Sequence, residues 1–295
     1  MVQACKATTE RPAGEGYKLL LAYSTGMYVL GVVAPAGVEV TSLVERLVNR
    51  LAGHGRVATV ERSTGEQEST QPRPSDAVAS YRLARDGEWV GTGDHRTLPE
   101  TLDELAPRYD YALVTGFDDA RLPHVVVGDA ESAGEVLLET PTVEDVDPAT
   151  VIEVLHATDP YVTLEALVEE VKNSPHAEKA GAIATFTGRV RARDHEDDDP
   201  TEYLEFEKYE GVAEERLATI REELEARDGV YEVRSHHRTG VIEYGEDIVF
   251  VVVLAGHREE AFQTVQDGIN RLKAEVPIFK KEVTTDEAFW VHTKG

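Results

Sequence analysis

The chain has 295 residues, which is long enough for two domains that each bury a core. It contains 56 Asp and Glu against 30 Lys and Arg, and this net charge of -26 is typical of a halophilic protein and disfavours nonspecific binding to nucleic acid or to an anionic membrane. The single cysteine, Cys5, excludes an intrachain disulfide, and no apolar run approaches the roughly 20 residues that cross a bilayer, so we expect a cytoplasmic protein.

Residues 1–26 lack the basic start and the apolar centre of a signal peptide, and we expect them to form a loose N-terminal extension. Residues 27–156 then alternate strand-like and helical segments. Apolar runs predict buried strands at 28–34, 56–62, 110–117 and 124–129. A helix is expected at about 41–53 with Thr41 as its N-cap, and a polar loop at 63–78. This order predicts an α/β domain with a mainly parallel sheet.

The stretch GVVAPAGVEVTSLVERL, residues 31–47, is laid out like a phosphate-binding loop between a strand and a helix. In the pattern G-x-x-x-x-G-K-[ST], however, the two glycine positions hold Ala34 and Glu39, and the lysine position holds Val40. Thr41 could still ligate magnesium, but a metal without a clamped phosphate is a poor site. We therefore expect a degenerate P-loop that binds no nucleotide and serves as a scaffold or a partner surface.

Residues 157–295 show a different order of elements. Strands are predicted at 181–188, 202–207, 230–237 and 247–256. Helices are predicted after Thr163, which is expected to cap the first of them, around 212–227 and around 258–275. This mixed order predicts an α+β domain.

Lysine is scarce in this chain, yet three lysines fall within RLKAEVPIFKKE, residues 271–282. Lys273 lies on the last turn of the preceding helix, which Pro277 ends, and Lys280 and Lys281 follow on an extended segment. The expected buried face of that helix consists of Phe262, Val265, Ile269, Leu272 and Val276. Adjacent like charges or partial burial would lower the pKa of such amines toward useful reactivity. The plainer interpretation is that these lysines favour a helix C-terminus and a solvated edge.

Two further basic pairs border predicted strands. His257 and Arg258 stand at the start of a helix, where outward backbone N–H groups favour an anion. Arg189 and Arg191 occupy alternate positions after another strand, so both project from one side of an extended chain. A sulfate, phosphate or carboxylate ligand is implied, although surface arginine pairs are also common where no such ligand binds.

Other polar groups are weaker candidates. His236, His237 and Arg238 end a predicted strand, and we favour a structural or supporting role for them over contact with a ligand. The acidic run at 195–200 is interpreted as a solvated loop, and no His/Cys spacing suggests zinc. We therefore expect neither a metal nor a cofactor.

The segments GAIATFTGRVR, HREEAF, LKAEVPIFKKE and FWVH, in this order, closely resemble the catalytic large subunit of molybdopterin synthase. The resemblance runs from about Ala157 to the C-terminus. It implies conversion of cyclic pyranopterin monophosphate to molybdopterin, with sulfur supplied by the thiocarboxylated Gly-Gly tail of a small ubiquitin-like subunit. The motif positions of that family fall on Phe186, Arg189, Arg191, His257, Arg258, Lys273, Lys280, Lys281 and Glu282. Arg189 stands where lysine is frequent, a change that keeps the charge and alters its geometry.

Roles follow from this resemblance. Lys273 and Lys280 are expected to be catalytic, because acyl transfer needs an amine or a polarising cation near the carbonyl. The expected substrate-binding residues are Phe186, Arg189, Arg191, His257, Arg258, Lys281 and Glu282. Arg258 and Lys273 lie about 22 Å apart along one predicted helix. We therefore expect a homodimer that shares its active sites, within a heterotetramer that includes two small subunits.

The first half, through GVVAPAGVEVTSLVERL and DYALVTGFDDARLPHVVV, resembles the nucleotide-binding adaptor of molybdenum cofactor guanylylation. In that family an acidic residue is common at the position of Thr115 and a basic one near Asp118, so this segment also departs from the pattern. Two other functions stay open. A nucleotide-binding adaptor with a regulatory second domain would bind GTP tightly, and a non-catalytic binder of ubiquitin-like proteins would form a complex without a dithiolene product.

Overall fold

The computed structural model describes residues 26–62, 78–193, 195–196, 198–209, 211–285 and 288–291. All but one residue of the expected N-terminal extension at 1–26, and all but one of the expected polar loop at 63–78, lie outside these residues. Across the described ranges, no helix combines the length and the apolar character needed to span a membrane.

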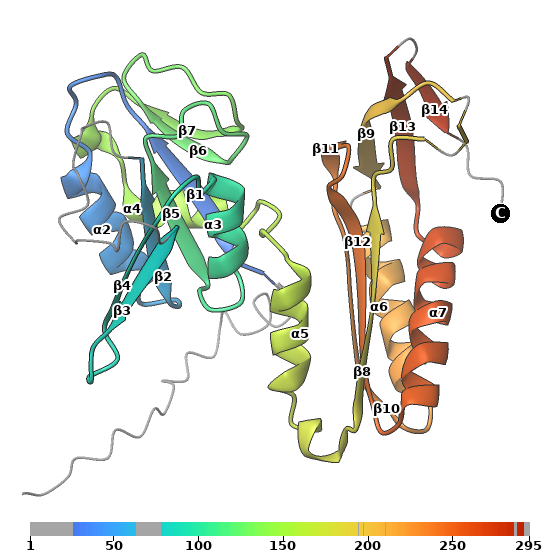
Figure 1. The fold of residues 1–295 in the computed structure, drawn as a ribbon. Coiled ribbons are helices and arrows are strands. Elements are labelled where there is room, and N and C mark those ends of the chain that lie inside the picture. Colours follow the sequence, from blue (N-terminus) through green and yellow to red (C-terminus); the bar gives the residue numbers. More distant parts are fainter. Residues whose placement is uncertain are drawn as a thin grey trace, which may run out of the picture.

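The N-terminal half is built on a five-stranded sheet with the order β2-β5-β1-β6-β7 (Figure 1). All neighbouring strands in it are parallel, as the sequence predicts. The strands are β1 (Tyr28–Val33), β2 (Val57–Glu61), β5 (Tyr111–Thr115), β6 (His124–Val127) and β7 (Val136–Thr140). Every residue of β1 is buried, because it is the central strand and is covered on both faces.

Helices cover both faces of this sheet (Figure 1). On one face α2 (Thr41–Leu51) and α4 (Pro148–Leu155) pack their leucines against Leu30 and Val32. On the other face α3 (Leu98–Leu105) packs against Val29. The short 3-10 helix η1 (Val143–Asp145) precedes α4.

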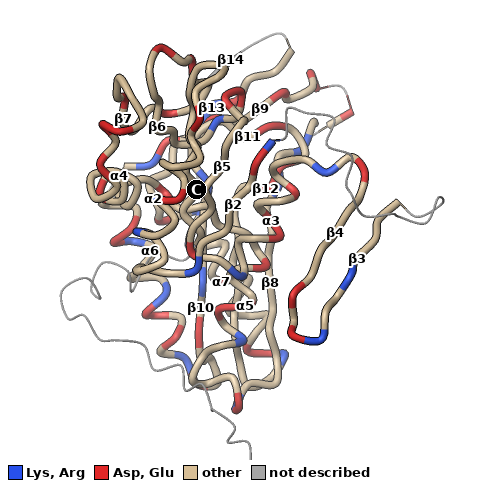
Figure 2. Tube along the Cα trace, turned by 90° about the vertical axis from the view of Figure 1, so that its left-hand side faces the viewer, with Lys and Arg blue, Asp and Glu red and all other residues tan. Residues whose placement is uncertain are grey.

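The N-terminal half differs from the prediction in the N-cap of α2 and in an additional hairpin. The N-cap of α2 is Val40, whose side chain makes no capping hydrogen bond, so Thr41 is the first helical residue and not the cap. A hairpin of β3 (Ala79–Leu83) and β4 (Trp89–Gly93) forms a separate two-stranded sheet that the apolar pattern did not predict. Figure 2 shows this hairpin standing apart from the rest of the chain.

The C-terminal half contains a three-stranded antiparallel sheet with the order β10-β12-β8. Its strands are β8 (Ala182–Arg189), β10 (Val230–His237) and β12 (Asp247–Ala255). One face packs against α6 (Val212–Glu225) and α7 (Arg258–Glu275), and the other packs against α5 (Leu164–Lys172). Thr163 caps α5 by accepting a hydrogen bond from the backbone N–H of Ala166, as expected.

A second antiparallel sheet, with the order β11-β9-β13-β14, lies beyond the C-terminal end of α7 (Figure 1). It consists of β9 (Thr201–Lys208), β11 (Gly240–Glu243), β13 (Ile278–Thr284) and β14 (Ala288–Val291). The 3-10 helix η2 (Ala177–Lys179) lies between α5 and β8. The mixed order of strands and helices agrees with the predicted α+β class.

One residue of the predicted buried face of α7 is not buried. Val265, Ile269, Leu272 and Val276 are buried, whereas the side chain of Phe262 is 65% exposed. Helical spacing identified the face correctly, but Ala261 and Thr264 are the buried residues of the first turns, and Phe262 lies at the edge of that face.

The segment that joins the two halves is hydrogen-bonded to the N-terminal half. Met27 and Tyr161 form an isolated antiparallel bridge, with two backbone hydrogen bonds of 2.9 and 2.8 Å. The hydroxyl of Tyr161 also donates to Asp103 of α3 at 2.7 Å. Acidic residues are spread along both halves, whereas basic residues are fewer (Figure 2).

Candidate functional site

A cavity of about 520 Å³ lies where the last turn of α7 meets the two C-terminal sheets. Four basic side chains line it, from the end of β8, from α7 and from β13, together with one carboxylate. These residues are Arg189, Arg191, Lys273, Lys280 and Glu282. Phe186, Phe206 and Ile248 contribute apolar lining. In a chain of net charge -26, this concentration of cations creates a local site for an anion.

Alternation along β13 decides which of its lysines reach the cavity. Lys280 and Glu282 point into it, and the lysine Nζ lies 3.1 Å from a glutamate oxygen. The other oxygen of Glu282 accepts a hydrogen bond of 2.6 Å from the buried Thr201 of β9. Because Thr201 holds the carboxylate and the carboxylate holds the amine, Lys280 is presented in a defined position.

Lys281 lies on the opposite face of the same sheet and does not line the cavity. Its Nζ donates to Glu205 of β9 at 2.9 Å. The hydrogen bond to Glu205 raises the pKa of Lys281, and the charge of that carboxylate adds to the effect. Lys281 is therefore held as a cation by β9, away from the other predicted site residues.

Lys273 differs from both of these lysines. It is exposed at the last turn of α7 and, among the described residues, it forms no ion pair or side-chain hydrogen bond. An amine that is already at the cavity wall and has no competing partner can contact a ligand without first breaking an interaction.

The two arginines sit at the mouth formed by the end of β8. Arg189 pairs with Asp247 at 3.1 Å and donates a further hydrogen bond to the carbonyl of Gly245. Its side chain is still 64% exposed, and Arg191 is also exposed. Phe186, three residues before Arg189 on β8, is partly buried and lines the cavity with them.

The structure does not bring His257 and Arg258 to this cavity. His257 is the N-cap of α7, Arg258 is its first residue, and both are exposed. Lys273 follows Arg258 by 15 positions on the same helix, which places the two residues about 22 Å apart along the axis. The predicted site residues therefore form two groups at opposite ends of α7.

His237 lines the same cavity, although sequence analysis favoured a structural role for it. It is the last residue of β10, and its ring meets the ring of Phe206 edge-on with centroids 4.9 Å apart. Strand alternation could have distinguished the two histidines, because adjacent residues of a strand face opposite sides of the sheet and only one of them can face this cavity. Phe206 could not be identified before the pairing of β9 with β13 was known.

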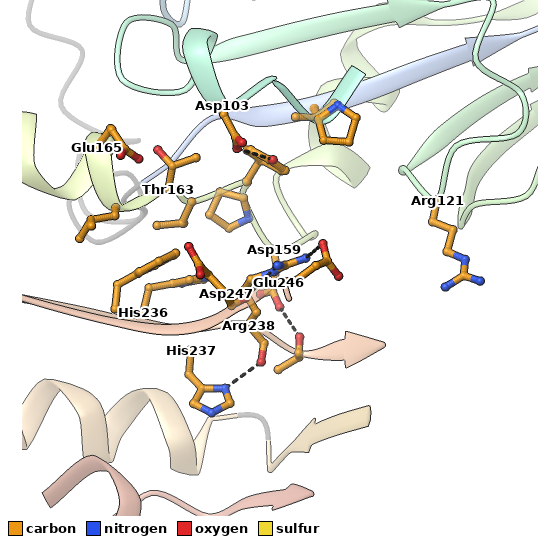
Figure 3. A pocket seen from close by; sticks show the side chains of 18 of the residues that line it. Asp103, Arg121, Asp159, Thr163, Glu165, His236, His237, Arg238, Glu246 and Asp247 are labelled. Atoms are coloured by element: carbon orange, nitrogen blue, oxygen red, sulfur yellow. Dashed lines mark hydrogen bonds and ion pairs between the residues drawn. The ribbon is translucent and has the colours of Figure 1, made fainter. Parts of the chain in front are cut away.

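A second cavity, of about 550 Å³, lies between the halves of the chain (Figure 3). Residues from both halves line it, including Asp103, Asp159, His236 and Arg238. Burial lowers the pKa of His236 to about 4. Arg189 and His237 line this cavity as well as the first one, so they form part of the wall between the two.

The altered loop of the N-terminal half presents few groups that favour a phosphate. Glu39 and Thr41 are exposed, and Val40 is partly buried against the core of α2. Within the part of the chain that the structure describes, no group of three or more His, Cys, Asp or Glu side chains could hold a metal ion.

Comparisons with known proteins found a family match in the C-terminal half and a relative that covers most of the chain. A family profile described as MoaE protein matches residues 158–275. A relative from Haloferax volcanii, described as a probable molybdopterin synthase, is 56% identical over 269 residues, which cover 91% of this chain and 100% of the relative. A relative from Escherichia coli, described as a molybdopterin synthase catalytic subunit, is 38% identical over 114 residues, which cover 39% of this chain and 75% of the relative.

The Haloferax volcanii match is too long for the C-terminal half alone and therefore includes most of the N-terminal half. Among solved structures, a MobB protein homolog from Bacillus stearothermophilus aligns with 45% of this chain and with 100% of its own. Its sequence identity is 21% and its TM-score is 0.35, which is too low to assign a fold.

Proposed function

The chain belongs to the molybdopterin synthase family of molybdenum cofactor biosynthesis, whose members are sulfurtransferases, and we propose the substrates and roles that its cavity serves. Sulfur passes from the thiocarboxylated C-terminus of a small ubiquitin-like subunit to cyclic pyranopterin monophosphate, giving molybdopterin. The observation that carries this proposal is the cavity at the end of α7, where four basic side chains gather in an otherwise acidic chain.

The cavity suits both reactants. A cyclic phosphate and a thiocarboxylate are anions, and Arg189 and Arg191 provide cations at the mouth, while Phe186 offers an aromatic surface to a flat pterin. Lys273 and Lys280 are the catalytic residues in this proposal, because a cation beside the acyl carbonyl stabilises the charge that develops there. Glu282 positions Lys280, and Lys281 positions β13 against β9.

The distance along α7 supports a shared site in a homodimer. His257 and Arg258 cannot serve the same pterin as Lys273 of their own chain, because about 22 Å of helix separates the two ends. In a twofold dimer, one chain contributes His257 and Arg258 and its partner contributes the lysines. Two small subunits then complete a heterotetramer.

We propose that the N-terminal half is a scaffold or a partner surface. Its parallel sheet is complete, but Val40 and Glu39 remove the main attraction for a phosphate. The competing adaptor function requires nucleotide binding at this loop. Calorimetry on the full chain with GTP separates the two functions, since only an adaptor binds it in the micromolar range.

The direct test is reconstitution. The purified chain, a thiocarboxylated small subunit and cyclic pyranopterin monophosphate are mixed, and molybdopterin is assayed after conversion to a fluorescent derivative. The expected result is product that depends on all three components. Formation of a stable complex with the small subunit but no dithiolene would instead identify a non-catalytic binder of ubiquitin-like proteins.

A further inference from the structure

His237 is a titratable side chain in the proposed sulfur-transfer cavity to which the proposal above gives no role. On β10 it pairs with Val249 of β12, and Val249 belongs to the apolar cluster on the α6 and α7 face of the sheet. Its neighbour His236 pairs with Phe250 and faces the side of α5. One histidine therefore lies in the cavity with the lysines, and the other does not.

The hydrogen bonds of His237 determine which ring nitrogen carries the proton. Its Nδ1 lies 2.7 Å from the backbone carbonyl oxygen of Arg238. A carbonyl oxygen can only accept, so Nδ1 carries the hydrogen in the neutral ring and Nε2 keeps its lone pair. Figure 3 shows this bond, with Nε2 on the far side of the ring.

The partners of the ring are themselves held in place. The backbone N–H of Arg238 donates to the carbonyl of Ile248 at 2.8 Å, and its guanidinium donates to the carbonyl of Asp247 at 2.8 Å. The edge-on contact with Phe206 restrains the plane of the imidazole. The lone pair of Nε2 thus has a fixed direction, which a general base requires.

The surroundings keep this histidine neutral. Burial lowers the pKa of His237, although the hydrogen bond to the carbonyl of Arg238 acts in the opposite direction. The charged groups that line the cavity with it are four cations and one carboxylate, namely Arg189, Arg191, Lys273, Lys280 and Glu282. On its other side, the second cavity brings His236, Arg238, Asp159, Glu246 and Asp247 to the same wall, so charges of both signs surround the ring and burial is the main cause that lowers its pKa.

The chemistry of the proposed function requires such a base. When the thiocarboxylate sulfur forms a bond to a pterin carbon, the carbon–oxygen bond at that carbon breaks and its oxygen leaves as water or with the phosphate. The small subunit is then joined to the pterin through a thioester, and each of the two sulfurs of the product requires one such step. Water must then add to the acyl carbon and the C–S bond must break, which leaves sulfur on the pterin as a thiolate and returns the small subunit as a carboxylate. The attacking water loses one proton to a base, and the new carboxylic acid loses its proton to solvent.

We propose that His237 Nε2 is the general base that accepts the proton of this water. The inference rests on the proposed sulfur transfer. It assigns the hydrolysis of the thioester to His237, which is not among the residues that the family motifs identify. Lys273 or Lys280 polarises the acyl carbonyl while His237 activates the nucleophile, so the two functions reside on different elements around one cavity.

The test uses His237→Asn, because the asparagine amide can still donate to the carbonyl of Arg238, whereas the basic nitrogen is lost together with the ring contact to Phe206. His236→Asn is the matched control on the other face of the strand. Each full-length chain is mixed with thiocarboxylated small subunit and cyclic pyranopterin monophosphate in a single turnover, and intact-protein mass spectrometry follows the small subunit. We expect His237→Asn to slow molybdopterin release by about 100-fold or more. A covalent adduct of the small subunit with the pterin should accumulate, and hydroxylamine, which cleaves thioesters, should discharge it.

Two results would overturn the assignment while wild-type turnover remains intact. One is a His237→Asn chain that releases product at the wild-type rate, and the other is a slow chain with no adduct and no response to hydroxylamine. The wild-type chain gives a test that does not depend on the variant folding. Its rate of adduct breakdown should fall tenfold per pH unit below the pKa of His237, and a rate independent of pH would refute the proposal. Failure of the proposed function itself is distinct, since the wild-type chain would then yield neither adduct nor product.

Discussion

The two halves of the chain differ in the charges that they place where an anion could bind. In the N-terminal half, a strand–loop–helix unit has the backbone layout of a phosphate site, but Val40 and Glu39 stand where attraction is needed. The C-terminal half contains no phosphate-loop motif. Four cations from the end of β8, the last turn of α7 and β13 nevertheless line one cavity. A fold thus supplies positions for a ligand, and individual side chains decide whether the ligand binds.

The largest expected effect comes from removing the cations of the C-terminal cavity. Lys273→Ala and Lys280→Ala should each reduce sulfur transfer by about 100-fold or more, because each removes a cation from the acyl carbonyl. Lys280→Ala also leaves Glu282 without its ion-pair partner in the cavity. Single-turnover assays of molybdopterin formation measure both variants.

Lys281→Ala is the matched control, since Lys281 neighbours Lys280 on β13 but faces Glu205. Its rate should stay within about threefold of wild type, as expected for the loss of a surface ion pair. Circular dichroism establishes that all three variants are folded. Near-normal turnover in both cavity variants would remove these lysines from the mechanism.

The next effect tests whether the cavity is completed by a second chain. An Arg258→Ala chain and a Lys273→Ala chain are each expected to be nearly inactive, because each spoils both sites of its own homodimer. After subunit exchange, half of the dimers are mixed and each of these has one intact site, so activity should recover toward about one quarter of wild type. No recovery, despite exchange demonstrated with differently tagged chains, would mean that each chain completes its own site.

A smaller effect concerns stability. Burial lowers the pKa of His124 and His156 in the N-terminal half and of His236 and His237 in the C-terminal half. The unfolded chain then binds more protons than the folded one below the unfolded pKa of about 6.5. The stability contributed by these groups is complete above that pH and is lost as the pH falls toward their folded pKa values.

Urea denaturation at several pH values measures this loss. For His236 the window extends from about 6.5 down to about 4. His236→Asn should therefore make the free energy of unfolding less dependent on pH across that window. An unchanged slope would show that His236 is not the group that titrates.

The smallest expected effect is in the N-terminal loop, where GTP and ATP should not bind at physiological concentrations. Isothermal titration calorimetry on the full chain should give no heat beyond dilution, because the loop offers no cation to the phosphates. Micromolar binding that disappears in Thr41→Ala would reverse this conclusion and favour the adaptor function.

Local patterns predicted most of the elements, and their failures have identifiable causes. The sequence TLPE contains the capping box of α3, since the side chains of Thr97 and Glu100 each accept from the other's backbone N–H, and the apolar pattern alone does not reveal this helix start. The hairpin of β3 and β4 lacks the buried apolar run that marks a strand, because most of its side chains are exposed. The exposure of Phe262 could not be predicted from helical spacing, which identifies a buried face but not which residues at its edge are covered.

The site was predictable where the residues lie close together in the sequence. Lys273 and Lys280 fall within one short segment, and both side chains line the same cavity. The hydrogen bond from Thr201 to Glu282 joins residues 81 positions apart, so only strand pairing reveals it. The same holds for Phe206 and His237, which meet because β9 and β10 belong to neighbouring sheets.

Because side chains alternate between the two faces of β13, the number of residues between Pro277 and Lys280 decides which side chains enter the cavity. Removing one residue between Pro277 and Lys280 would turn Lys281 inward and Glu282 outward, and inserting one would place Phe279 inward and press Lys280 against Glu205. Either change keeps every residue type but exchanges the two faces of the strand. Related chains should therefore show no variation in length between the end of α7 and Lys280.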